Sequence, residues 1–203
     1  AFVLQTEKRE AGILPTFDKV SPFDVLAMKN ARYHYLLIRF LNYFDNLRVL
    51  AIVRNPCAAL TSWMENPREF PEGSDPMREW RLGTCKNQGR PENFFGFYKW
   101  REAANIFLDL QSSFQNRVHV VRYEDLIENP IGVSQELFAF CGLEFGEQTE
   151  KFLRESSAGH SDSPYSVYRG KDVNSSWRGK LDSRIVKDIE QELLGTRLET
   201  FLV

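Results

Sequence analysis

The chain lacks the features that mark membrane proteins and nucleic-acid binders. None of its apolar runs reaches the roughly 18 residues that a transmembrane helix needs. Its first residues do not show the basic segment followed by an apolar one that is typical of a signal peptide. The formal net charge is only −2, so we expect no membrane segment and no nucleic-acid partner.

Cysteine is scarce as well. The three cysteines, Cys57, Cys85 and Cys141, are odd in number and far apart, which argues against a disulfide framework. None of them stands beside a second cysteine or a histidine at the spacing of a zinc site, so we expect no metal. Reduced thiols of this kind are typical of the cytoplasm, and the sequence therefore predicts a cytoplasmic protein.

What the chain does contain fits one globular domain over residues 1–203. Hydrophobic residues make up 42% and charged residues 27% of the sequence, an ordinary composition for a chain that builds one sizeable core. Sixteen phenylalanines and four tryptophans predict an aromatic-rich core or pocket. Because the chain starts with Ala1 rather than methionine, we expect an N-terminally truncated portion of the domain.

Strand-like and helix-like patterns alternate along the sequence. Short strands are expected at Phe23–Met28 and 116–123, and the nearly continuous apolar run Leu47–Val53 predicts a strand buried on both faces. A helix is expected from Pro56, whereas Glu65–Glu92 is rich in proline, glycine and charge and is expected to form a long loop. Further helices are expected over 31–45, 95–114, 130–142 and 182–194. This order predicts an α/β domain with a mainly parallel sheet.

An arginine follows directly after the most apolar of these strands. Ligands of open parallel sheets bind beyond the carboxyl ends of the strands, and Arg54 stands at such an end. Its planar guanidinium suits a phosphate group, and Ser62, two turns into the following helix, offers a hydroxyl donor to the same anion. The alternative is a surface arginine beside a helix-capping segment, with a serine that faces water.

Four stretches in order resemble one enzyme family. Arg54-Asn55-Pro56 followed by Ser62 resembles the 3′-phosphate-binding motif of sulfotransferases, which use 3′-phosphoadenosine 5′-phosphosulfate (PAPS). The stretches MKNARYHY, VHVVRYEDLIENP and YRGKDVNSSWRGKL resemble, in turn, the family's strand-end lysine segment, its strand with a YEDL…NP sequence, and its late basic-glycine loop. The resemblance extends over most of Phe23 to Leu194.

This resemblance implies a fold, a reaction and a set of site residues. The implied fold is a three-layer α/β sandwich with a central, mainly parallel sheet, like that of P-loop nucleotide-binding proteins. The implied reaction transfers a sulfuryl group from PAPS to a hydroxyl or amine acceptor, without a metal. The implied nucleotide contacts are Arg54 and Ser62 on the 3′-phosphate, Tyr123 near the adenine, and Arg169, Gly170 and Lys171 in the late loop.

Each implied role has a plainer alternative. Tyr123 also fits a strand-end tyrosine with a hydrogen-bonded hydroxyl, and residues 169–171 also fit a solvated basic loop. Glu124 and Asp125 are expected only to cap the next helical turn, and Trp177 to pack in the core.

The catalytic residues are less well marked. Lys29 is the candidate for offsetting charge on the oxygen that leaves the sulfuryl group, and an ordinary surface lysine is the alternative. The family pattern has a histidine where this chain has Ala31. His34 is the nearest candidate base, with a partly buried helix histidine as the alternative; Glu7 and His119 are lesser candidates.

Three functions compete on these observations. An active PAPS-dependent sulfotransferase fits the four stretches. A nucleotide kinase would need a Walker-type glycine loop, which the sequence does not contain. A non-catalytic sulfotransferase-like module is the third, since the segment before Lys29 has one glycine and no cradle for a 5′-phosphosulfate. The sequence does not identify the acceptor.

Overall fold

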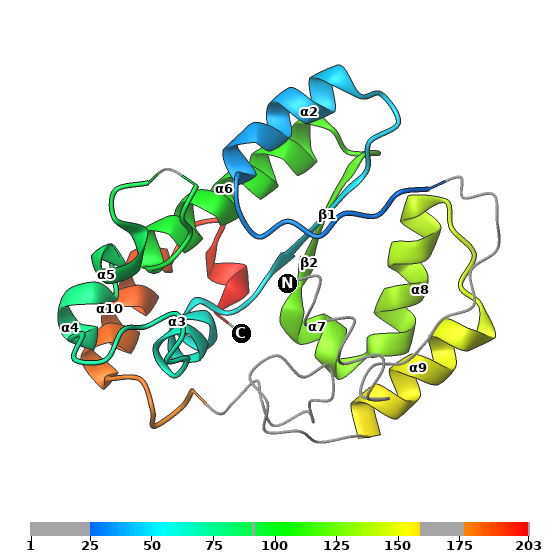
Figure 1. The fold of residues 1–203 in the computed structure, drawn as a ribbon. Helices are drawn as coiled ribbons and strands as arrows, with labels where there is room; N and C mark the ends of the chain where they lie inside the picture. Colours follow the sequence, from blue (N-terminus) through cyan, green and yellow to red (C-terminus); the bar gives the residue numbers. More distant parts are fainter. Residues whose placement is uncertain (1–24, 91, 159–176, 203) are drawn as a thin grey trace.

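The computed structural model describes residues 25–90, 92–158 and 177–202. At its centre, two strands, β1 (Val49–Val53) and β2 (Val118–Arg122), pair in parallel from Val49 opposite Val118 to Val53 opposite Arg122 (Figure 1). Parallel pairing needs a crossover connection between the strands, and the helices between them supply it. The predicted α/β class with a parallel sheet is confirmed, and within the described ranges the sheet has two strands.

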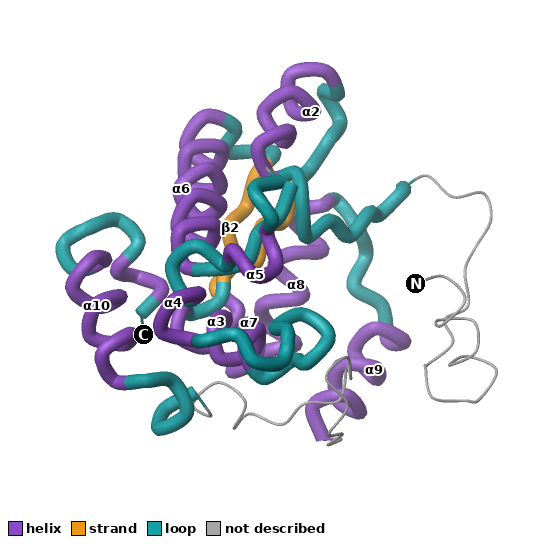
Figure 2. Tube along the Cα trace, turned by 60° about the vertical axis from the view of Figure 1, so that its left-hand side comes forward, coloured by secondary structure: helices purple, strands orange, loops and turns teal. Residues whose placement is uncertain are grey.

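One face of the sheet is covered by the longest helix. Helix α6 (Phe97–Ser113) packs against β2, and the short helices η1 (His34–Leu36) and α2 (Leu37–Tyr43) lie alongside it in both views (Figures 1 and 2). Leu41, Leu110 and Val118 form a small buried cluster here. This layer holds the crossover helix against the strands.

The larger core lies at the carboxyl end of β1. Helix α3 (Pro56–Met64) starts directly after the strand and carries proline in its first turn, as predicted. It packs against α6 and against α10 (Ser183–Leu193), which is capped by Asp182. The core consists mainly of aromatic and aliphatic side chains from these elements, among them Leu60, Trp63, Phe97, Ile185, Ile189, Leu193 and Phe201 of η3 (Glu199–Phe201).

The segment expected as a long loop is a folded unit. It contains two short helices, α4 (Pro76–Glu79) and α5 (Thr84–Asn87). The buried Asn87 side chain donates to the carbonyl groups of Leu82 and Phe95, both at 2.7 Å, and accepts the N–H of Phe95 at 3.1 Å. One side chain therefore provides hydrogen bonds for backbone groups on both sides of the segment. In a helix or a sheet, other backbone groups would provide these hydrogen bonds.

Three further helices follow β2. They are α7 (Tyr123–Glu128), directly below β2 in the view of Figure 1, and α8 (Pro130–Cys141) and α9 (Glu147–Ala158) on its right. Helix α8 ends at Gly142, whose φ of 69° is the left-handed conformation that glycine adopts readily. The ring of His119 lies 5.3 Å from that of Phe140 on α8, so this histidine has a packing role within the strand.

Two expectations from the sequence are wrong. The described part of Phe23–Met28, from Val25 onward, forms no strand, and its apolar side chains are exposed. Strand β1 is not buried on both faces in the described structure, since Leu50 and Ile52 are 38% and 51% exposed. Phe40 and Phe44 near the end of α2 are exposed as well. The described elements leave these apolar side chains exposed.

No helix in the described ranges is both long and apolar enough to cross a lipid bilayer.

Candidate functional site

The carboxyl ends of β1 and β2 bring two predicted site residues together. Arg54 follows β1, and Tyr123 follows β2. The guanidinium carbon of Arg54 lies 5.0 Å from the centre of the Tyr123 ring, within the range of a cation–π contact. Both side chains are half-buried. The parallel pairing therefore places a cation and an aromatic ring side by side at the sheet edge where ligands of α/β proteins bind.

The peptide that joins Arg54 to Asn55 is held on both sides. Its carbonyl oxygen, on Arg54, accepts a hydrogen bond of 2.9 Å from Nε1 of Trp100 on α6. Its N–H, on Asn55, donates to Oε1 of Glu124 on α7, also at 2.9 Å. Two side chains from two other elements thus fix the backbone from which the Arg54 side chain extends.

Asn55 is buried and uses its whole side chain. Its Oδ1 accepts the N–H groups of Cys57 and Ala58, which caps α3. Its Nδ2 donates to the carbonyl oxygen of Leu202 at 2.9 Å. Asparagine suits this position because a short side chain with an acceptor and a donor caps the helix and ties it to the C-terminal segment at once.

Ser62 is exposed on α3, as a ligand-binding hydroxyl would have to be. Its neighbour Thr61 points inward and donates to the carbonyl oxygen of Cys57 at 2.8 Å. Burial, and after it the charge of Glu190, raises the pKa of the Cys57 thiol to about 12. Cys57 is therefore protonated at neutral pH and has no nucleophilic role.

Sequence reasoning assigned Glu124 too small a role. It lies in the first turn of α7 and is 7% exposed, but its carboxylate reaches across to Asn55 instead of capping its own helix. Trp100 lies in the segment expected as the helix 95–114, where nothing marked it as a residue of the site. Neither residue is among the expected nucleotide contacts, but both hold the backbone behind the Arg54 side chain. Nothing in the local sequence of Glu124 or Trp100 shows which distant residue it contacts.

The two candidate catalytic residues lie in different surroundings. Lys29 is exposed in an irregular segment. His34 is 6% exposed, and its Nε2 lies 2.9 Å from Oε1 of Glu102 on α6. Burial works against ionisation of Glu102, yet hydrogen bonds from Lys99 and His34 lower the pKa of this carboxyl. Its pairing and burial place His34 in the packing between η1 and α6, which favours the structural alternative.

The late basic loop, Arg169, Gly170 and Lys171, lies outside the described residues. The chain is described again from Trp177, which is buried in the core as expected. Lys180 then forms an ion pair of 2.8 Å with Glu65, the residue that ends α3. The segment that follows the loop is therefore attached to the helix that carries Ser62.

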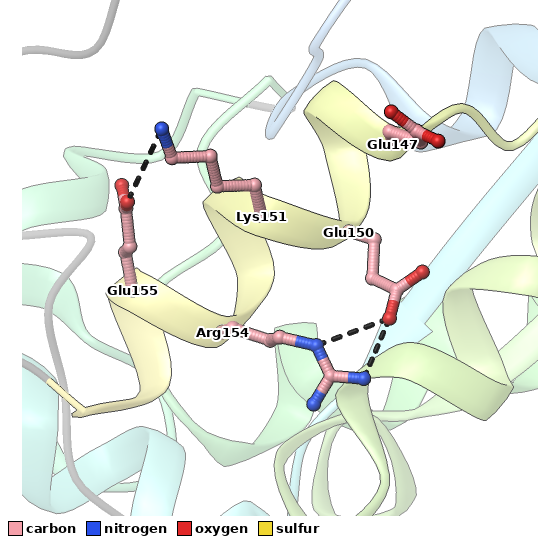
Figure 3. Close-up of a pocket in the computed structure, with 5 residues that line it drawn as sticks. All are labelled: Glu147, Glu150, Lys151, Arg154 and Glu155. Atoms are coloured by element: carbon pink, nitrogen blue, oxygen red, sulfur yellow. Dashed lines mark hydrogen bonds and ion pairs between the residues drawn. The ribbon is translucent and has the colours of Figure 1, made fainter.

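A separate hollow lies on the exposed face of α9. It has a volume of about 440 Å³ and is lined by five charged residues of this one helix, Glu147, Glu150, Lys151, Arg154 and Glu155 (Figure 3). Arg154 pairs with Glu150 and Lys151 with Glu155. Opposite charges within the helix satisfy one another, so this hollow has no net attraction for an anion.

Metal chemistry finds no support in the described ranges. They contain no group of three or more histidine, cysteine, aspartate or glutamate side chains able to hold a metal ion.

Comparisons with known proteins agree with the motifs. A family model described as the sulfotransferase domain matches residues 24–188. Carbohydrate sulfotransferase 1 of Danio rerio is 29% identical over 153 residues, which are 70% of this chain and 34% of the relative. Carbohydrate sulfotransferase 3 of Tetronarce californica is 24% identical over 157 residues, or 72% of this chain and 34% of the relative. The chain thus spans about a third of the length of these relatives. No solved structure matches it.

The similarity to these relatives also overturns one expectation from the sequence. The prediction of a cytoplasmic protein is wrong, because the relatives matched are carbohydrate sulfotransferases. That prediction rested on the number and spacing of three cysteines, and a chain with unpaired cysteines is not restricted to one compartment.

Proposed function

The chain belongs to the sulfotransferase domain family, and from that premise we propose that it takes part in sulfuryl transfer from PAPS to a hydroxyl group of a carbohydrate. The family implies PAPS as the co-substrate. The relatives' names supply the class of acceptor, and a carbohydrate offers hydroxyl groups as the attacking atoms.

The contact between Arg54 and Tyr123 is the observation that supports this proposal. A fixed guanidinium at the carboxyl end of a parallel strand suits a phosphate, and a neighbouring aromatic ring suits a purine base. The two side chains lie side by side, so one nucleotide, whose 3′-phosphate and base project from the same ribose, can reach both. We assign Arg54 to the 3′-phosphate and Tyr123 to the adenine end.

Other residues complete the proposed nucleotide site. Ser62 adds a hydroxyl donor to the 3′-phosphate from the exposed face of α3. Arg169, Gly170 and Lys171 add two cations and a glycine at which the backbone approaches the phosphate closely. The attachment of the following segment to the end of α3, through Lys180 and Glu65, supports this placement.

In the reaction, the acceptor oxygen attacks sulfur and the bond from sulfur to the 5′-phosphate oxygen breaks. The acceptor's proton passes to a base, and adenosine 3′,5′-bisphosphate leaves. We propose Lys29 as the donor to the leaving oxygen, because an exposed ammonium can approach it. His34 is the base candidate that the sequence offers, and a histidine oriented by Glu102 has the chemistry for proton transfer. At 6% exposure its ring has little access to an acceptor, so we propose that His34 packs between η1 and α6 and leave the base unassigned.

A nucleotide-binding module without chemistry is the second candidate. The segment before Lys29 contains one glycine and no glycine-rich turn. Transfer needs donors that hold the 5′-phosphosulfate in line, and such a turn supplies them as backbone N–H groups. The two candidates share the 3′-phosphate site and differ only in transfer.

The test is calorimetric binding of adenosine 3′,5′-bisphosphate and of adenosine 5′-phosphosulfate, which lacks the 3′-phosphate. We expect Arg54→Ala to weaken binding of the bisphosphate by about 1.5–3 kcal/mol, the range of a charge-assisted hydrogen bond, and to leave the phosphosulfate nearly unaffected. Arg48→Ala removes the same charge at the opposite end of β1 and serves as the control. Equal losses for both ligands would make Arg54 structural.

Radiolabelled sulfuryl transfer from PAPS to a panel of oligosaccharides separates the two candidates. Transfer to a carbohydrate supports the enzyme, and binding of the bisphosphate without transfer to any acceptor supports the binding module.

A further inference from the structure

The peptide between Arg54 and Asn55 joins the proposed phosphate ligand to the cap of α3, and Glu124 holds its N–H. We propose that Glu124 is a positioning residue, which sets the direction of the Arg54 guanidinium by fixing this peptide. The inference rests on the proposed 3′-phosphate site and adds to it a residue that does not touch the nucleotide.

The burial of Glu124 calls for an explanation. Its side chain is 7% exposed and its Oε1 accepts the N–H of Asn55, whereas its Oε2 is buried and has no hydrogen-bond partner among the described residues. Burying a carboxylate is costly unless its oxygens are satisfied. The hydrogen bond from Asn55 is thus the contact that this buried side chain makes with the site, and it needs an acceptor oxygen rather than a charge.

The bond joins elements that are far apart in the sequence. Glu124 follows Tyr123 in α7, and Asn55 follows Arg54 after β1, so one hydrogen bond ties together the two strand ends that carry the proposed ligands. Tyr123 contacts the guanidinium of Arg54, and Glu124 holds the backbone behind it. Two successive residues of α7 thus restrain the side chain and the main chain of the same arginine.

A restraint at this peptide has a large effect at the guanidinium. The arginine side chain is long, so a small rotation of its backbone moves the planar head by much more and spoils two-point contact with a phosphate. Trp100 restrains the carbonyl oxygen of the same peptide. Loss of either bond leaves the peptide held on one side only.

When Glu124 is replaced, a positioning role and simple electrostatics predict opposite changes in the affinity for the nucleotide anion. Removing a carboxylate close to an anion site strengthens anion binding by Coulomb's law. Removing a residue that positions the phosphate ligand weakens it. A loss of affinity on replacing Glu124 therefore cannot come from the change in charge.

The experiment measures binding of adenosine 3′,5′-bisphosphate and of adenosine 5′-monophosphate to the chain at one ionic strength. We expect Glu124→Ala to lower affinity for the bisphosphate about tenfold, the size of one charge-assisted hydrogen bond, and to leave the monophosphate unchanged. Glu124→Gln retains an oxygen for the Asn55 N–H and should keep most of the preference for the bisphosphate over the monophosphate. Asp125→Ala, which removes an exposed carboxylate one residue later, should leave the preference as it is.

The outcomes separate this inference from the proposed function. If the unmodified chain does not prefer the bisphosphate, the proposed 3′-phosphate site is wrong. If it does and Glu124→Ala keeps the full preference, the positioning role alone is wrong. Should Glu124→Ala fail to fold, Glu124→Met, which keeps the length of the side chain and removes the acceptor for the Asn55 N–H, takes its place. The same loss of preference then supports positioning, and an unchanged preference overturns it.

Discussion

The side-chain amide of Asn55 donates a hydrogen bond of 2.9 Å to the carbonyl oxygen of Leu202, which lies 147 residues further along the chain. The same side chain caps α3 with its oxygen. The start of the helix behind the proposed phosphate site is therefore anchored to the C-terminal segment, where Phe201 is buried in the main core.

Replacing Asn55 should lower the stability of the protein more than replacing an ordinary helix-capping residue. We expect Asn55→Ala to lower the free energy of unfolding by about 2–3 kcal/mol, because a buried cap and a second hydrogen bond are lost together. Asn129→Ala is the matched control: Asn129 also caps a helix, through a single exposed bond to Gly132, and should cost about 1 kcal/mol. Urea unfolding measures both, and equal losses would show that the bond to Leu202 adds nothing.

A change at His34 distinguishes packing from catalysis. We expect His34→Leu to leave the rate of sulfuryl transfer within about threefold, because the ring is buried against α6 and Glu102 keeps its ion pair with Lys99. A general base contributes about 100-fold or more to a rate. A fall of that size at unchanged binding of adenosine 3′,5′-bisphosphate would assign the base role to His34 after all.

The cap of α10 should make stability depend on pH in the acid range. Hydrogen bonds from the side chain and backbone of Arg184 lower the pKa of Asp182 from 3.8 to about 2. A lowered pKa in the folded state means that the stabilisation is complete above about pH 4 and is lost as the pH falls through about 2.

Asp182→Asn tests this dependence, because asparagine still caps a helix but cannot pair with the charge of Arg184. The melting temperatures of the two proteins should differ at pH 5 and converge towards pH 2. A difference that stays constant over this range would rule out the charge as its origin.

Gly96, which precedes α6, tolerates no side chain. Its φ is 87°, and an added Cβ would lie 2.8 Å from the carbonyl oxygen of Arg81 and from the backbone nitrogen of Gly83. Gly89 has a similar φ of 71° with open space around it. We expect Gly89→Ala to cost about 1–2 kcal/mol of unfolding free energy for the left-handed conformation alone. Gly96→Ala should cost at least about 2 kcal/mol more for the overlap, and similar losses would contradict the close approach.

Local sequence signals predicted the elements well and their surroundings less well. The apolar runs located β1 and β2, and Pro56, Gly142 and Asp182 marked helix boundaries, because strand periodicity and caps depend on a few neighbouring residues. The exposure of Leu50 and Ile52 was not predictable, since what covers a strand is decided by distant parts of the chain.

In the candidate site too, local sequence predicted which residues take part but not all of the contacts between them. Arg54 and Tyr123 could be proposed because each follows a recognisable strand, and parallel strands place their ends together. Glu124 was expected only to cap its own helix. Its bond to Asn55 depends on how α7 lies against the start of α3, which no pattern within either segment encodes.

The bonds around Arg54 and Asn55 also bear on the order of events in folding. They join residues separated by 46, 69 and 147 positions in the chain, through Trp100, Glu124 and Leu202. Contacts of such long range close late and slow the search for the native state. No isolated hairpin or helix pair contains the arginine in its final setting. Ligand capture by a refolding chain should therefore lag behind the recovery of helical circular dichroism and coincide with the final cooperative phase.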